Sequence, residues 1–198
     1  MNTITTTLTT EAVFSDNGLK RYLLRKSWNT DLPQLAIIML APSAASGIAL
    51  DNTTSLVLNN ADRLGYGSVA IVNLFATLND FSLTHTEDED PDNLKAILDI
   101  CQNADQIVYA PGTGKAKSKV FQQRQEQVLN ALRPYEFKLN CLTNSEGKAR
   151  LQHPLSPALK TWVLSSLSVN ELIEDPKPAA PAPKKRSMPK VTKKEIAT

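Results

Sequence analysis

The chain has 198 residues, of which 41% are hydrophobic and 6% aromatic, enough to build an independent core. Its charge is unevenly distributed. Residues 176–198 hold seven basic residues against one acidic, a net charge of +6, which leaves −4 for residues 1–175. This composition argues against a disordered polyelectrolyte or a coiled coil, and it assigns the basic character to the C-terminal segment.

No membrane, secreted or metal-binding class is indicated. The longest apolar run, residues 35–41, has the length of a strand, whereas a spanning helix needs about 18 apolar residues. Residues 1–10 lack the basic and apolar regions of a secretory signal, so we expect a cytoplasmic protein. Cys101 and Cys141 stand apart without a CxxC motif, and we expect buried reduced thiols, no metal site and no cofactor.

The N-terminal part predicts a hairpin and then a buried strand. Two apolar runs within residues 12–28 flank Asp16-Asn17-Gly18, and an Asn-Gly pair favours a tight hairpin turn. Residues 35–41 form a continuous apolar run followed by a proline, which is typical of a strand buried on both faces.

Helix and strand signals then alternate. Apolar side chains at helical spacing predict three helices, over residues 53–64, 92–102 and 115–132. Short apolar runs predict three more strands, over residues 69–75, 106–110 and 137–142. Ser156 and Pro157 predict the start of a last helix, which would carry Leu159, Trp162, Val163 and Leu167. Because parallel strands need crossover helices, the alternation predicts an α/β three-layer sandwich with a mostly parallel central sheet.

We expect a single domain over residues 12–170, preceded by a flexible N-terminus over residues 1–11. Residues 171–198 are expected to form a disordered Pro/Lys-rich tail. Residues 176–198 contain five of the 12 prolines and almost no large apolar side chains, so they cannot bury enough surface to offset their ordering entropy.

Candidate ligand-binding residues follow the predicted parallel strands. They are Pro42 and Ser43 after the first strand, Asn73 at the end of the second, and Gly112 and Lys115 after the third. Open α/β sheets bind ligands beyond the carboxyl ends of their strands, and small residues there let backbone N–H groups approach an anion or a base. These positions therefore predict a nucleotide or nucleobase pocket at that edge of the sheet.

Hydroxyl and carboxylate side chains after the first strand have two interpretations. Those of Ser43, Ser46, Thr53 and Thr54 suit either a ligand or the turns and caps around a helix start. Asp51 is a candidate catalytic residue, but Asp is also a common N-cap, so both roles stay open.

The segment Gly112-Thr-Gly-Lys115 resembles a phosphate-binding P-loop only in part. The motif would require Gly where Tyr109 stands and a magnesium-binding hydroxyl where Ala116 stands. We therefore expect a phosphate contact through the backbone and Lys115, without nucleoside triphosphatase activity.

His153 is the second candidate catalytic residue. It lies before Pro154 in a predicted loop, where a merely packed core role is less expected, and ligand binding and a structural role both stay open. His85 lies in a polar acidic loop and is expected to be solvated. The contiguous carboxylates of residues 87–90 lack the fixed spacing of a cation site.

An ordered set of motifs resembles the bacterial and phage family known as domain of unknown function 1643. The motifs are residues 21–28 (RYLLRKSW), 40–45 (LAPSAA), 51–54 (DNTT), 65–67 (GYG), 72–75 (VNLF), 110–112 (APG) and 153–155 (HPL). The likeness covers about residues 12–167. Ala41 replaces an Asn of the family pattern, and Pro111 stands where the family usually has Trp. The family is uncharacterised, so the resemblance implies a fold and a set of conspicuous positions.

The order of these motifs is more distantly similar to the uracil-DNA glycosylase superfamily. By that resemblance, Pro42 and Ser43 would lie in the loop that positions an attacking water, Asn73 would read a base edge, and His153 would stabilise charge on the departing base. Ala41 has no polar side chain where glycosylases place the group that orients the water. Whether the chain is an enzyme is therefore left open, and a reaction would be of the glycosylase-like hydrolase type.

The leading hypothesis is an α/β protein with a nucleotide or nucleobase pocket that associates with nucleic acid through its basic tail. The tail side chains expected to contact phosphates are Lys184, Lys185, Arg186, Lys190, Lys193 and Lys194. The tail is equally compatible with protein docking or a solubilising role. Alternatives for the whole chain are a non-catalytic interaction protein of a phage or mobile element, and an enzyme acting on a free nucleotide.

Overall fold

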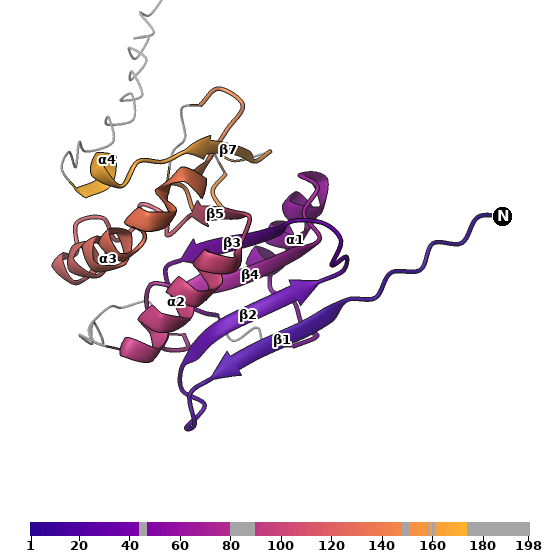
Figure 1. The fold of residues 1–198 in the computed structure, drawn as a ribbon, viewed down its shortest axis with the longest axis horizontal. Coiled ribbons are helices and arrows are strands. Elements are labelled where there is room, and N and C mark those ends of the chain that lie inside the picture. Colours follow the sequence, from indigo (N-terminus) through magenta and orange to yellow (C-terminus); the bar gives the residue numbers. More distant parts are fainter. Residues whose placement is uncertain (44–46, 80–89, 148–150, 158, 160, 174–198) are drawn as a thin grey trace, which may run out of the picture.

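The computed structural model describes residues 1–43, 47–79, 90–147, 151–157, 159 and 161–173, and these form a mixed sheet flanked by helices (Figure 1). The strands are β1 (Thr9–Phe14), β2 (Arg21–Ser27), β3 (Gln34–Met39), β4 (Ser68–Asn73), β5 (Gln106–Tyr109), β6 (Leu139–Thr143) and β7 (Val163–Ser166). The helices are α1 (Asn52–Arg63), α2 (Pro91–Asn103), α3 (Lys119–Ala131), the 3-10 helix η1 (Arg133–Lys138) and α4 (Val169–Ile173).

The strands lie in the order β1-β2-β4-β3-β5-β6-β7. The central strands β4, β3, β5 and β6 are parallel, whereas β1, β2 and β7 pair antiparallel at the two edges. The predicted N-terminal hairpin and mostly parallel centre are therefore confirmed. After β3 the chain moves outward to β4, and it then returns to place β5 on the other side of β3. The direction of winding thus reverses between β3 and β5, the position where open α/β sheets bind ligands.

The core has two layers, one on each face of the sheet. Ala36 and Ile38 of β3 pack toward the face covered by α2 and α3, and Leu35 and Ile37 pack toward the face covered by α1 (Figure 1). All four side chains have 0% exposure, which confirms the prediction of a strand buried on both faces. The buried thiols of Cys101 and Cys141 are free, as expected, and burial raises the pKa of Cys101 to about 12.

Two glycines explain the GYG motif. Gly65 has a φ of +86° directly after the end of α1, a left-handed conformation that only glycine adopts freely. At Gly67, a Cβ atom would lie 1.8 Å from the carbonyl oxygen of Asn29, so no side chain fits. The first glycine ends the helix, and the second lets the chain pass against the segment that leads into β3.

Two predicted elements begin later in the chain than expected. The helix predicted over residues 115–132 begins only at Lys119, because Ser118 is its N-cap and accepts a hydrogen bond from the Phe121 N–H at 3.4 Å. The strand predicted from residue 137 begins at Leu139, since the chain first forms η1 and leaves Phe137 exposed.

The predicted last helix is wrong, because β7 occupies its place. Val163 and Leu164 pair with Thr143 and Leu142 of β6 in antiparallel register, which satisfies backbone groups that an uncovered β6 edge would leave unpaired. Trp162 is nevertheless buried, at 1% exposure, in the core layer that includes α1.

The described residues contain no helix of the length and apolarity required to cross a membrane. β1 begins at Thr9, within the stretch predicted to be a flexible N-terminus. Residues 171–173, where the disordered tail was predicted to begin, form the end of α4 instead. The rest of the predicted tail lies outside the described residues, as do Ser46, His85 and the carboxylates of residues 87–89. The domain boundaries and the location remain predictions.

Candidate functional site

A cavity of about 370 Å³ lies at the carboxyl edge of the sheet, where the winding reverses. Its size is within the range usual for small-molecule sites. The lining residues come from the ends of β3 and β5, the loop before α3, and the segment before β7, and they are Leu40, Pro111, Gly112, Thr113, Gly114, Lys115, Gln152, His153 and Ser156. The structure thus brings together three residues that the sequence selected from two separate segments: Gly112 and Lys115 from one, and His153 from the other.

Two left-handed backbone positions adjoin His153, one in space and one in the chain. Gly112 has a φ of +81°, and a Cβ atom there would lie 3.0 Å from the Cβ of His153. Leu151, two residues before the histidine, has a φ of +57°, a conformation that costs a bulky side chain free energy. Strained backbone of this kind persists where the surroundings hold it, and it often marks functional loops.

The hydrogen bonds of His153 define its tautomer. Its Nδ1 accepts a hydrogen bond from the Leu155 N–H at 3.2 Å, so in the neutral ring the proton is on Nε2. Burial lowers the pKa of His153, although the negative charge of Asp51 acts in the opposite direction. At neutral pH the imidazole is therefore an uncharged ring with one N–H to donate.

Asp51 is the N-cap of α1. One carboxylate oxygen accepts a hydrogen bond from the Thr54 N–H at 2.6 Å, and the other accepts one from the Ser43 hydroxyl. Burial acts to raise the pKa of Asp51, but the hydrogen bonds from Ser43 and Thr54 outweigh it, and the pKa lies below its usual value. Asp51 is therefore an ionised cap whose field also reaches His153.

Two buried cations of β2 hold the loop between β3 and α1. Arg21 donates from a guanidinium nitrogen to the Ser43 carbonyl at 3.3 Å, and Lys26 donates to the Gly47 carbonyl and to the Thr10 hydroxyl at 2.8 Å. Both basic side chains are at most 2% exposed, and burial lowers the pKa of each. Sequence patterns gave no sign of this role, because the partners are carbonyl groups distant along the chain.

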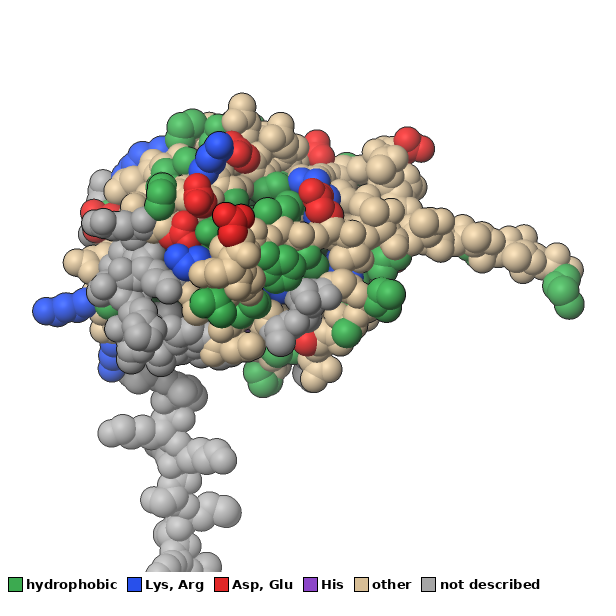
Figure 2. Space-filling model, turned by 90° about the horizontal axis from the view of Figure 1, so that it is seen from below, with side chains coloured by type: hydrophobic (Ala, Val, Ile, Leu, Met, Phe, Trp, Pro, Cys, Tyr) green, Lys and Arg blue, Asp and Glu red, His purple; other side chains and the backbone are tan. Residues whose placement is uncertain are grey.

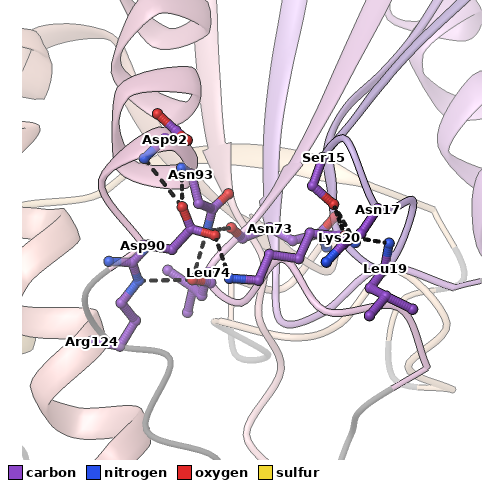
Figure 3. Close-up of polar contacts among 10 residues, drawn as sticks. All are labelled: Ser15, Asn17, Leu19, Lys20, Asn73, Leu74, Asp90, Asp92, Asn93 and Arg124. Atoms are coloured by element: carbon purple, nitrogen blue, oxygen red, sulfur yellow. Dashed lines mark hydrogen bonds and ion pairs between the residues drawn. The ribbon is translucent and has the colours of Figure 1, made fainter.

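A polar network fixes the turn that follows β4 (Figure 3). Asn93 donates to the carbonyls of Asn73 and Leu74 at 3.1 Å, and Arg124 donates to the Leu74 carbonyl at 2.8 Å. Asp90 caps α2 through the N–H groups of its first turn and forms an ion pair with Lys20 at 2.9 Å. The NLF motif is therefore a backbone turn tied to α2 and α3.

The side chain of Asn73 is 1% exposed, and neither its oxygen nor its nitrogen has a hydrogen-bond partner among the described residues. Buried amides are normally bonded, so this one has unused capacity to bind a donor and an acceptor. It does not line the cavity. Pro42, which also does not line it, accepts a hydrogen bond from the Asn79 N–H through its carbonyl at 3.2 Å.

Sequence reasoning missed four cavity residues, namely Leu40, Pro111, Gln152 and Ser156, whereas Thr113 and Gly114 belong to the backbone segment expected to contact a phosphate. Gln152 and Ser156 flank the histidine motif, and the Ser156 hydroxyl donates to the Gln152 side-chain oxygen at 2.8 Å. Their closeness to His153 in the chain was the available signal. Within the described ranges, no three His, Cys, Asp or Glu side chains gather as a metal site requires.

Comparison with known families agrees with the motifs. The profile described as "Protein of unknown function (DUF1643)" matches residues 21–155, which include β2, the strands of the parallel centre and His153. No curated protein and no solved structure matches the chain, and none of these comparisons supports the more distant likeness to uracil-DNA glycosylases. The match spans more than half of the sequence, and the chain belongs to the DUF1643 family of proteins of unknown function.

Proposed function

We propose that this protein binds a nucleotide, or a nucleobase within a nucleic acid, in the cavity at the carboxyl edge of the sheet. The observation that carries the proposal is that three kinds of ligand-binding group line one cavity. The Gly112–Lys115 loop suits a phosphate, the apolar surfaces of Leu40 and Pro111 suit the flat face of a base, and the Nε2–H of His153 suits a base carbonyl. A nucleotide carries all three partners.

The buried amide of Asn73, at the end of β4 and outside the lining of the cavity, is a second candidate group for a base edge. An Asn side chain offers one acceptor and two donors, and a base edge presents the same types of group. The Asn73 amide has no partner among the described residues, and leaving such a group unbonded costs about 1–3 kcal/mol. A base edge that reached Asn73 would recover this free energy as binding affinity.

The basic tail makes a nucleic acid the expected partner. Its positive charges provide phosphate affinity without sequence preference, with a strong dependence on salt. Residues 1–175 have a net charge of −4, so they offer little general attraction for a polyanion. Association through the tail and recognition in the cavity are therefore separate parts of the proposal.

Binding is better supported than base excision. A glycosylase-like reaction needs a group that orients water, and Ala41 has no polar side chain. Asp51 is ionised, but hydrogen bonds from Ser43 and Thr54 occupy its two oxygens and lower its pKa, which weakens it as a base. These features favour, as a second candidate function, a non-catalytic interaction protein that has the fold but carries out no reaction.

Thermal-shift measurements on the full chain test the proposal. The panel consists of free bases, nucleosides, nucleotides and short single-stranded DNA, with and without magnesium. A ligand at 100 times its Kd should stabilise the protein by about 2.7 kcal/mol. Lys115→Ala and His153→Ala should remove the shift, whereas Lys95→Ala, at an exposed position on α2, should keep it. No shift with any compound would overturn the proposal.

A further inference from the structure

We infer that the cavity receives its base from a single-stranded polynucleotide whose backbone lies over Lys115, Lys117 and Lys119, which we name the lysine track. The inference rests on the proposed function and specifies its ligand class. It places a phosphate-binding surface on the folded domain, separate from the basic tail.

The first argument is the distribution of charge. Between residues 110 and 125 the chain has four basic residues and no acidic one, whereas the rest of residues 1–175 has a net charge of −8. Lys117 and Lys119 are exposed, and Lys115 is partly exposed. In the described part of the chain, none of the three has an ion pair or a side-chain hydrogen bond that would neutralise it. Their charge is therefore available to a ligand.

The second argument is continuity with the cavity. Lys115 lines the cavity, and Lys117 and Lys119 follow it on either side of Ser118, the N-cap of α3. This segment is not extended, because the Ser118 N–H donates to the Lys115 carbonyl at 2.8 Å, so Lys117 and Lys119 lie at a turn and a helix start directly after the cavity residue Lys115. A ligand that filled the cavity and also reached Lys119 would thus extend beyond a nucleoside monophosphate.

A single strand fits this surface better than a duplex. In a duplex the base is stacked and paired, and its extrusion costs a few kcal/mol, whereas a base of a single strand can enter a cavity directly. On the face drawn in Figure 2, acidic and basic side chains lie next to one another among hydrophobic ones. Among the described side chains drawn on that face, the positive charges are scattered rather than gathered in an extended surface of the kind a duplex backbone requires.

The test is the salt dependence of binding to an oligonucleotide. Fluorescence anisotropy would measure the affinity of the full chain for a labelled eight-nucleotide single strand between 50 and 400 mM salt, roughly the range over which phosphate contacts weaken. Each phosphate contact in a single strand contributes about 0.7 to the slope of log K against log salt. Lys117→Gln and Lys119→Gln should each lower the slope by about that amount. Lys95→Gln removes the same charge from α2 and should leave the slope unchanged, and the tail is present in every variant.

The outcomes separate this inference from the proposed function. A slope unchanged in both lysine-track variants, or lowered equally by Lys95→Gln, overturns the lysine track. Tighter binding of a nucleoside triphosphate than of the oligonucleotide by the unmodified protein also overturns it, because the phosphates would then belong to a free nucleotide. Failure of mononucleotides and oligonucleotides alike to bind overturns the proposed function itself.

Discussion

Gly112 leaves the space that His153 occupies, since a Cβ atom at residue 112 would lie 3.0 Å from the histidine Cβ. The space for the histidine side chain thus depends on the glycine, and Leu151, two residues before the histidine, has a left-handed backbone. The APG and HPL motifs contact one another through Gly112 and His153, which are 41 positions apart in the chain.

Gly112→Ala should displace His153 and weaken ligand binding. The residue has a φ of +81°, and a left-handed conformation costs an L-residue about 1–2 kcal/mol, so the free energy of unfolding should fall by about that amount. Affinity should fall about tenfold or more, a loss of about 1.4 kcal/mol. The control is Gly18→Ala in the turn between β1 and β2, where φ is +68° but a Cβ meets nothing within 4 Å, so stability should fall and affinity should not. An equal loss of affinity in the two variants would show that displacement of the histidine is not the cause.

Stability should decrease at mildly acidic pH because of His153. Burial lowers its pKa in the folded protein, with Asp51 acting in the opposite direction, whereas the unfolded chain titrates near pH 6.5. As the pH falls below about 6.5, the unfolded state takes up a proton that the folded state does not, so the free energy of unfolding falls. The free energy of unfolding becomes constant again once the pH lies below the pKa of His153 in the folded protein.

Urea unfolding of the full chain between pH 5.5 and 7.5 would measure this decrease, since the window brackets the ordinary pKa of about 6.5. His153→Gln should be less pH-dependent than the unmodified protein, and His85→Gln is the comparison that removes the other histidine. Asp51 and Asp90 do not contribute to the pH dependence in this window, because their pKa values are lowered from 3.8 and they titrate at more acidic pH. A pH profile unaffected by His153→Gln would contradict the prediction.

Turn residues and apolar spacing predicted the elements that are determined by residues close together in the chain. The Asn17-Gly18 turn predicted the hairpin, and the apolar spacing predicted α1 and α2 within one or two residues. The failure at the last predicted helix is non-local. Residues 163–166 look compatible with a helix in isolation, and they form β7 because the edge of β6 is available for pairing. The start of α3 depends on Ser118, a cap that the apolar pattern alone does not locate.

The site shows the same division. The rule that ligands bind beyond strand ends selected Gly112 and Lys115, which line the cavity, but also Pro42 and Asn73, which do not. His153, selected from its loop before a proline, lies beside Gly112 because the topology brings the two loops together. The rule could not reveal that Arg21 and Lys26 reach across from β2 to carbonyls of the β3–α1 loop. Asp51 proves to be a cap, one of the two roles left open, and whether it also acts on a ligand remains a prediction.

Asp90 should stabilise the protein through both its cap and its ion pair. It accepts two backbone hydrogen bonds at 3.1 Å and the Lys20 ammonium at 2.9 Å. Asp90→Ala should lower the free energy of unfolding by about 1–2 kcal/mol, the usual cost of a lost N-cap. Asp90→Asn should cost less, because Asn also caps helices. Asp99→Ala, at an exposed position of the same helix, should change stability by no more than about 0.5 kcal/mol. Equal losses for Ala and Asn would assign the effect to the ion pair alone.

The two buried asparagines should respond in opposite ways to the same substitution. Asn93 donates to two carbonyls, and Asn93→Leu should lower the free energy of unfolding by about 2 kcal/mol, since each such bond contributes about 1 kcal/mol. Asn73 has no side-chain hydrogen bond among the described residues, so Asn73→Leu should leave stability unchanged or raise it. The same change should weaken binding of any base that Asn73 contacts, measured as a smaller thermal shift. If Asn73→Leu instead destabilises the free protein as much as Asn93→Leu does, the amide is a structural group and base reading by Asn73 is excluded. A stable variant that no longer binds would identify Asn73 as a polar group kept at the expense of stability for its ligand.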